Sequence, residues 1–137
     1  MPYKAIKAIE FSYGHRLINY TGKCKNLHGH NAKVEVVIVS KKLDEKGMVL
    51  DFVEIKNKLK RWIDENWDHR MILCEKDPLL PALRGTDPTI TTIATNPTAE
   101  NLAKILFEKA KELSLPVAEI IFWETESSKA AYSESST

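Results

Sequence analysis

The stretch His30-Asn31-Ala32-Lys33-Val34-Glu35-Val36-Val37-Ile38-Val39-Ser40 carries the clearest structural signal in the chain. Side chains of a strand alternate between the two faces of its sheet, and the residues of this stretch divide accordingly. One face would carry His30, Ala32, Val34, Val36 and Ile38. The other would carry Asn31, Lys33, Glu35, Val37 and Val39. We therefore expect a β-strand over residues 30–40, with an apolar face against a core.

Three further segments predict strands around this one. Residues 3–11 alternate loosely and read as a first strand. A turn at residues 44–47 would join the 30–40 strand to a short strand over residues 48–50, which makes a β-hairpin. Residues 117–125 read as a final strand that follows Pro116.

Two helices are predicted between these strands. Asp51 occupies an N-cap position with Glu54 three residues later, and an apolar stripe follows to about Asn66. Thr98 would cap a second helix. The segment between them contains three prolines and is expected to be irregular. The order of elements predicts an α+β fold, with an antiparallel four-stranded sheet and two helices on one face.

Length and charge limit the class of protein. The chain has 137 residues, enough for one domain, which we expect over residues 1–126, with 127–137 as a flexible C-terminal tail. Twenty basic and 19 acidic residues give a net charge of +1, so nothing favours a nucleic-acid partner. No apolar run approaches the roughly 20 residues of a membrane span. Two cysteines are too few for a secreted disulfide framework. We expect a cytoplasmic protein with reduced thiols.

Three of the four histidines fall close together, as His15 and as the pair His28-Gly29-His30. Positions i and i+2 of a strand share a face, so both imidazoles of the pair can approach one ion while a neighbouring strand supplies the third. Three neutral imidazoles leave a fourth position open on zinc, which is the catalytic arrangement. The alternative is that these are ordinary hydrogen-bonded histidines, and the pair alone does not decide between the two.

Cys24 and the dipeptide Asp68-His69 are further candidates for chemistry. Lys23 and Lys25 flank Cys24, and nearby positive charge favours the reactive thiolate. The alternative for Cys24 is a small buried hydrophobe, which we expect for Cys74. Asp68 could orient His69 as a general base, although such a pair is often a solvated turn.

Glu124 would share a strand face with Ile120 and Phe122, which directs a carboxylate toward the covered side of the sheet. A buried carboxylate needs partners, and it can accept paired hydrogen bonds from a heterocycle such as guanine or pterin. A splayed strand end that leaves Glu124 half exposed is the alternative.

Six segments bring these residues together in a fixed order. They are Phe11-Ser12-Tyr13-Gly14-His15-Arg16, Cys24-Lys25-Asn26-Leu27-His28-Gly29-His30, Gly47-Met48-Val49-Leu50-Asp51-Phe52, Asp68-His69, Asn96-Pro97-Thr98-Ala99-Glu100-Asn101 and Trp123-Glu124-Thr125. In this order they resemble the 6-pyruvoyltetrahydropterin synthase family, which includes 6-carboxytetrahydropterin synthase of the queuosine pathway. The resemblance extends from about Ile6 to Thr125.

The resemblance implies the tunnelling fold, in which the sheets of several subunits join into a barrel. A homohexamer of two stacked trimers, with active sites between subunits, is the expected assembly. Zn²⁺ would be the cofactor and a reduced pterin the small-molecule substrate. The roles implied for matching positions are zinc ligands for His15, His28 and His30, catalysis for Cys24, Asp68 and His69, and pterin binding for Glu124, Thr98 and Glu100.

The three residues between Cys24 and His28 resemble the bacterial and archaeal 6-carboxytetrahydropterin synthases, since the animal biopterin enzymes have a longer gap. Two departures from the family bear on substrate preference: Ile72-Leu73 replaces a common Leu-Asn pair, and the 75–95 loop is long. The implied reaction converts 7,8-dihydroneopterin triphosphate to 6-carboxy-5,6,7,8-tetrahydropterin, acetaldehyde and triphosphate by a zinc-dependent lyase. Alternatives are a 6-pyruvoyltetrahydropterin synthase, a non-catalytic pterin-binding relative and a zinc hydrolase.

Overall fold

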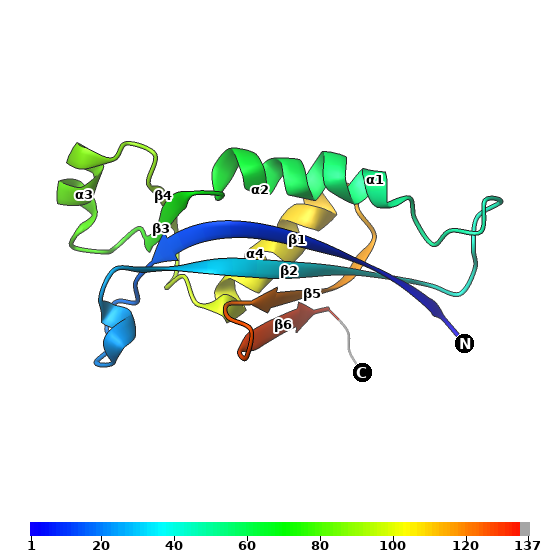
Figure 1. Ribbon diagram of the computed structural model, residues 1–137, viewed down its shortest axis with the longest axis horizontal. Coiled ribbons are helices and arrows are strands. Elements are labelled where there is room, and N and C mark those ends of the chain that lie inside the picture. Colours follow the sequence, from blue (N-terminus) through cyan, green and yellow to red (C-terminus); the bar gives the residue numbers. More distant parts are fainter. Residues whose placement is uncertain (135–137) are drawn as a thin grey trace.

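The computed structural model describes residues 1–134 and contains one mixed six-stranded sheet (Figure 1). The strands are β1 (Tyr3–His15), β2 (His28–Ser40), β3 (Arg70–Cys74), β4 (Thr91–Ile93), β5 (Val117–Trp123) and β6 (Lys129–Ser133). Their order across the sheet is β4-β3-β1-β2-β5-β6. The long β1 and β2 therefore form the centre of the sheet.

The antiparallel pair of β1 and β2 places the histidines. Tyr13 lies opposite His30 and His15 lies opposite His28, so all four side chains share one face of the sheet. The strand predicted over residues 30–40 is confirmed and begins two residues earlier. The first strand continues to His15 rather than ending at Phe11. This extension brings His15 beside the other two histidines.

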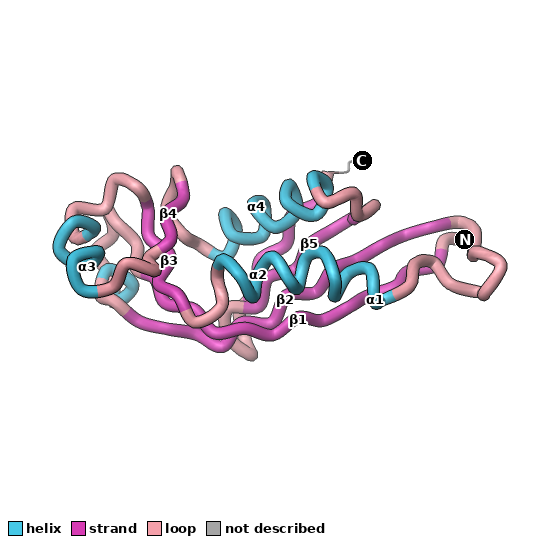
Figure 2. The backbone as a smooth tube through the Cα atoms, turned by 90° about the horizontal axis from the view of Figure 1, so that it is seen from above, coloured by secondary structure: helices cyan, strands magenta, loops and turns pink. Residues whose placement is uncertain are grey.

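Two helices cover the same face of the sheet, as predicted (Figure 2). The first is continuous through α1 (Phe52–Ile55), the π-helical η2 (Lys56–Lys60) and α2 (Arg61–Asn66), and the second is α4 (Ala99–Glu112). Two short helices lie in loops: the 3-10 helix η1 (Lys23–Lys25) and α3 (Leu80–Thr86). Both predicted caps are confirmed, because Asp51 accepts a hydrogen bond from the Val53 amide and Thr98 accepts one from the Asn101 amide.

The core lies between these helices and the sheet. The strands contribute Ile9, Phe11, Val34, Val36, Ile120 and Phe122, and the helices contribute Ile55, Leu59, Ile63, Leu102, Leu106 and Phe107. None of the helices in the described part of the chain is long and apolar enough to cross a membrane.

The predicted hairpin is wrong, because residues 48–50 do not form a strand. The carboxylate of Asp44 accepts hydrogen bonds from the amides of Lys46 and Met48, and its own amide donates to the Met48 carbonyl. The turn therefore satisfies its own backbone groups. In addition, β1 and β5 occupy both edges of β2, so no edge remains for a further strand.

The expected four-stranded antiparallel sheet is also wrong. The region expected to be irregular contains β3, which pairs in parallel with β1, and β4, which pairs in parallel with β3. Its prolines suggested a loop, but Ile72, Leu73 and Cys74 are buried and form a short strand. The expected tail is wrong for Lys129–Ser133, which pairs with β5, and Tyr132 packs on Phe107 with ring centroids 5.1 Å apart. Residues 135–137 of that tail lie outside the described residues.

Candidate metal centre and active site

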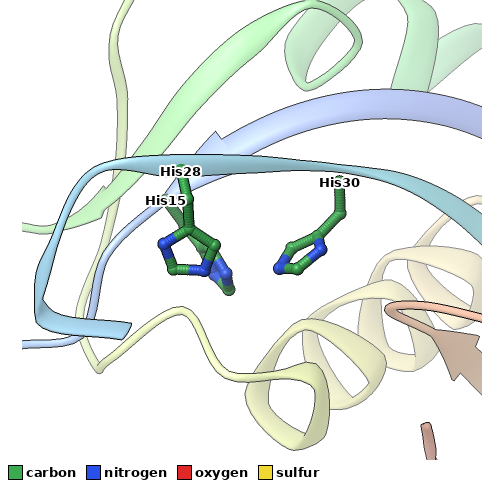
Figure 3. Close-up of side chains that lie close together, drawn as sticks. All are labelled: His15, His28 and His30. Carbon is green, nitrogen blue, oxygen red and sulfur yellow. The ribbon is translucent and has the colours of Figure 1, made fainter. Parts of the chain in front are cut away.

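Three imidazoles converge at one end of the β1–β2 pair (Figure 3). Their ring centroids are 4.6 Å apart for His15 and His28, 5.1 Å for His15 and His30, and 5.0 Å for His28 and His30. The nitrogen atoms available as ligands all lie within 4.8 Å of one another. His15 is buried and the other two are half-buried. The predicted convergence of His15, His28 and His30 on one site is therefore present in the fold.

Backbone carbonyls orient two of these rings. The Nδ1 atom of His15 lies 2.7 Å from the Pro97 carbonyl, and the Nδ1 atom of His28 lies 2.7 Å from the Asn26 carbonyl. A carbonyl only accepts, so each Nδ1 carries the proton and each Nε2 presents a lone pair. The Nε2 atoms of His15 and His30 are buried and have no hydrogen-bond partner among the described residues.

Unpartnered buried nitrogens are costly, so a ligand is expected to satisfy them. A tetrahedral zinc ion needs ligand nitrogens about 2.0–2.1 Å from the metal, and the present spacing needs only small side-chain movements to reach that distance. The donor set therefore fits a catalytic zinc ion with an open fourth position.

Burial favours the neutral form that a metal ligand requires. Burial is the largest cause that lowers the pKa of His15, to about 4, against the opposing effect of the Pro97 carbonyl. Burial also lowers the pKa of His30, although the Glu124 carboxylate opposes it. Both imidazoles are therefore neutral at neutral pH and available to a cation.

Glu124 lies beside the histidines, directly after β5. One of its carboxylate oxygens lies 3.7 Å from the His15 Nε2 atom and the other 3.8 Å from the His30 Nε2 atom. Its side chain is 25% exposed, so it lies at the mouth of the site. The prediction that strand alternation turns Glu124 toward the covered face is confirmed.

A pocket of about 230 Å³ opens beside this cluster. Its lining includes His15, Cys24, Thr98, Glu100, Glu124 and Lys129. Cys24 belongs to η1 and is half-buried, and its carbonyl accepts a 2.8 Å hydrogen bond from the Leu17 amide. The fold thus brings Cys24, Thr98, Glu100 and Glu124 together with the histidines.

Asp68 and His69 lie in a different pocket, of about 640 Å³. Its lining includes Ser12, Asn31, Lys33 and Trp123, and none of its residues lines the first pocket. Ser12 and His15 differ by an odd number of positions on β1, so their side chains leave opposite faces of the sheet. Within one chain, Asp68 and His69 are therefore separated from Cys24.

The Asp68 carboxylate is held in place where it lies. It accepts a 3.0 Å hydrogen bond from the Ser12 amide and lies 3.0 Å from the His69 Nδ1 atom. Although burial raises the pKa of Asp68, the hydrogen bonds from Ser12 and His69 outweigh it and hold the pKa below its usual value. His69 has a φ of 62° and a side chain that is 79% exposed. The dipeptide therefore presents an ionised carboxylate and an accessible imidazole at the surface.

Comparison with known proteins places this site in a family. The family described as 6-pyruvoyl tetrahydropterin synthase matches residues 4–135. The chain belongs to the 6-pyruvoyl tetrahydropterin synthase family. It is 44% identical over 102 residues to 6-carboxy-5,6,7,8-tetrahydropterin synthase of Rickettsia felis. This alignment covers 73% of this chain and 74% of the Rickettsia felis protein. It is 33% identical over 162 residues to the Aquifex aeolicus protein of the same name. That alignment covers 98% of this chain and 99% of the Aquifex aeolicus protein.

Solved structures show the same fold. An uncharacterized protein from Wolinella succinogenes superposes with a TM-score of 0.84 at 26% identity, over 98% of this chain and 99% of that chain. The 6-pyruvoyl tetrahydropterin synthase of Caenorhabditis elegans superposes with a TM-score of 0.73 at 27% identity. The superposition covers 98% of this chain and 97% of that chain. This member of the 6-pyruvoyl tetrahydropterin synthase family is thus a pterin synthase at the family level.

Two features of this 6-pyruvoyl tetrahydropterin synthase relative were not singled out from the sequence. Tyr13 is buried beside the histidines, and its hydroxyl has no partner among the described residues. Arg16 makes two 2.8 Å hydrogen bonds to the buried Asp77 carboxylate and a third, of 3.0 Å, to the Lys25 carbonyl. The position of Tyr13 follows from alternation once β1 is extended to His15. The Arg16–Asp77 pair spans 61 positions and has no local sequence signal.

Proposed function

We propose that the protein is a zinc-dependent lyase of the queuosine-type deazapurine pathway that acts on 7,8-dihydroneopterin triphosphate. With one water consumed, the products would be 6-carboxy-5,6,7,8-tetrahydropterin, acetaldehyde and triphosphate. The observation that carries the proposal is the convergence of three oriented imidazoles beside Cys24 and Glu124. The names of the relatives in Rickettsia felis and Aquifex aeolicus support the carboxy-forming branch.

His15, His28 and His30 would hold the zinc ion through their Nε2 atoms. When bound, the ion would supply Lewis-acid stabilisation of negative charge that develops on side-chain oxygens of the substrate. The chain itself keeps His15 and His30 unprotonated by burial, which prepares them for that ion.

Glu124 would bind the pterin ring. A carboxylate can accept two parallel hydrogen bonds from the amino group and ring N–H of an aminopyrimidinone. Thr98 caps α4 and Glu100 lies in its first turn, and both line the pocket, so they would complete the lining around the ring. The reacting side chain of the substrate would then extend from the ring toward the histidines and Cys24.

Cys24 would move protons on the carbons of the substrate side chain. Its thiol lines the pocket beside the histidines, where it would act as the proton-transferring group. Proton removal beside the hydroxyl-bearing carbons allows triphosphate to depart, and cleavage of a carbon–carbon bond then releases acetaldehyde.

Asp68 and His69 would complete the proton relay from a second subunit. The 230 Å³ pocket of one chain is smaller than the roughly 300–1,000 Å³ typical of small-molecule sites, which supports a site completed by another chain. We propose a homohexamer of two stacked trimers, in which each active site pairs Cys24 of one chain with Asp68 and His69 of a neighbour.

Incubation of the zinc-loaded protein with 7,8-dihydroneopterin triphosphate tests this function, with products identified by mass. The proposal predicts the 6-carboxy product together with acetaldehyde. A 6-pyruvoyl product without acetaldehyde would instead assign the biopterin-type reaction. Binding of substrate without turnover would make the chain a non-catalytic relative and would contradict the proposal.

A further inference from the structure

Tyr13 is a buried tyrosine within the candidate site, although the proposed reaction gives it no role. It is only 3% exposed, and its hydroxyl makes no hydrogen bond to any residue that the structure describes. A buried hydroxyl without a partner is unfavourable by an amount similar to a lost hydrogen bond. Such a group is retained at little cost only if it has a partner when the site is in use.

Aromatic neighbours fix the position of the Tyr13 ring. Its centroid lies 5.0 Å from that of His15 and 5.7 Å from that of His30. It also lies 5.7 Å from the ring of Phe122, on β5, although β2 separates β1 from β5 in the sheet. Tyr13 therefore reaches from β1 toward the end of β5.

Glu124 follows that end of β5 and is the charged group nearest the rings that Tyr13 contacts. Its carboxylate oxygens lie 3.7 and 3.8 Å from the Nε2 atoms of His15 and His30, the two imidazoles against which the Tyr13 ring packs. The other unpartnered acceptors nearby are the Nε2 atoms of His15 and His30, which are reserved for the metal in the proposed enzyme. The Glu124 carboxylate is then the acceptor that remains, and a charged acceptor makes the stronger hydrogen bond.

We propose that Tyr13 is a positioning residue that donates its phenolic hydrogen bond to Glu124 and so fixes the carboxylate that binds the pterin ring. This inference rests on the proposed function of Glu124. The carboxylate oxygens lie 3.7 and 3.8 Å from two metal-facing nitrogens, so a free Glu124 side chain can turn toward the metal. A donor on the core side holds it away from the metal, with lone pairs directed at the incoming ring. Tyr13 thus acts on substrate affinity through Glu124.

A double-mutant cycle on the zinc-loaded protein tests this role. The variants are Tyr13→Phe, Glu124→Gln and the double variant, and the probe is neopterin, whose binding is followed by its fluorescence. Tyr13→Phe removes only the hydroxyl and retains the ring, so packing is conserved. Tyr132→Phe, on β6 and outside the site, is the matched control.

We expect Tyr13→Phe to weaken neopterin binding about tenfold in the wild-type background. In the Glu124→Gln background the same change should weaken binding less than about twofold, because the partner is already altered. Zinc content and the binding by Tyr132→Phe should be unchanged. A structural role for Tyr13 would not produce this dependence on Glu124.

Three outcomes would overturn the inference: unchanged binding in Tyr13→Phe, an equal loss in both backgrounds, or loss of zinc from Tyr13→Phe. Wild-type protein that retains zinc but does not bind neopterin would overturn the proposed function itself, and this inference with it. Failure of the Tyr13 inference alone is distinguishable from failure of the proposed function, because the former leaves neopterin binding by the wild-type protein intact.

Discussion

Hydrogen bonds donated by Nδ1 to the Pro97 and Asn26 carbonyls decide which nitrogen of His15 and of His28 faces the site. Each carbonyl fixes the proton on Nδ1 and leaves Nε2 for a cation. A metal held in this way depends on all three imidazoles, because two nitrogens provide far weaker binding than three.

His28→Ala should therefore abolish zinc binding, with zinc content falling to less than about a tenth of one ion per chain after dialysis. His69→Ala is the matched control, since His69 lies in the other pocket and is 79% exposed. Metal analysis of both purified variants gives the result. Retention of a full zinc ion by His28→Ala would remove His28 from the ligand set.

Cys24→Ala should keep zinc and lose turnover by about 10²-fold or more, because proton transfer by a positioned group contributes about that factor. The matched control is Cys74→Ala, which removes a buried thiol of β3 and should cost stability while retaining activity. Steady-state turnover, together with zinc content, measures both effects. Near-full turnover by Cys24→Ala would show that another group moves the proton.

The sequence predicts individual site residues well where chemistry and spacing coincide. His15, His28, His30 and Glu124 come together as strand alternation predicts. Cys24 lines the same pocket, as the family resemblance implies. A first strand over residues 3–11 does not include Tyr13, which joins the covered face only because β1 extends to His15. Asp77 was missed because its partner Arg16 lies 61 positions away, and only the tertiary fold brings the two together.

The connection between the Cys24 loop and the β3–α3 turn is the pair of Arg16 and Asp77. The Asp77 side chain is fully buried and that of Arg16 is 16% exposed, so the pair is screened little by water. Arg16 also binds the carbonyl of Lys25, next to Cys24. Loss of the Asp77 charge would therefore leave a guanidinium uncompensated and loosen η1.

Asp77→Asn should lower the free energy of unfolding by about 3 kcal/mol at pH 7, as for other buried pairs that lose one partner. The side-chain hydrogen bonds from Arg16 hold the pKa of Asp77 below its usual range. The difference in the free energy of unfolding between wild type and Asp77→Asn is therefore largest above the unfolded-state pKa of about 3.9. It is lost as the pH falls through the lower folded-state pKa of Asp77.

Urea denaturation of wild type and Asp77→Asn between pH 7 and pH 3 measures this dependence. Asp64→Asn is the control, because Asp64 pairs with Lys60 at the surface and should change stability by less than about 1 kcal/mol. If the difference in the free energy of unfolding between wild type and Asp77→Asn stays constant as the pH falls, the Asp77 charge does not stabilise the fold.

Long strands and helices with a clear hydrophobic period can be predicted from the sequence, whereas short strands cannot. β2 and the two long helices follow from alternation, apolar stripes and caps. β4 has only three residues, and β6 has the composition of a tail. Both exist because a neighbouring strand offers an edge and the core accepts Ile93 and Tyr132. Such pairing is a tertiary effect that a local pattern does not contain.

The predicted site residues lie on two opposite faces of the sheet. The three histidines, Cys24 and Glu124 lie on the side that the helices cover, whereas Asp68 and His69 line a pocket with Ser12, Asn31 and Lys33 from the opposite face. One chain therefore does not bring the thiol and the dipeptide together. The proposed site needs both groups and would therefore require two chains.

Co-expression of Cys24→Ala and His69→Ala chains tests this claim most directly. Each variant alone should be inactive, because every site lacks one of the two groups. In mixed oligomers with random assembly, about a quarter of the sites pair an intact Cys24 with an intact His69, so turnover of 7,8-dihydroneopterin triphosphate should recover to about a quarter of the wild-type value. Mixed oligomers that stay as inactive as either variant alone would contradict a site shared between subunits.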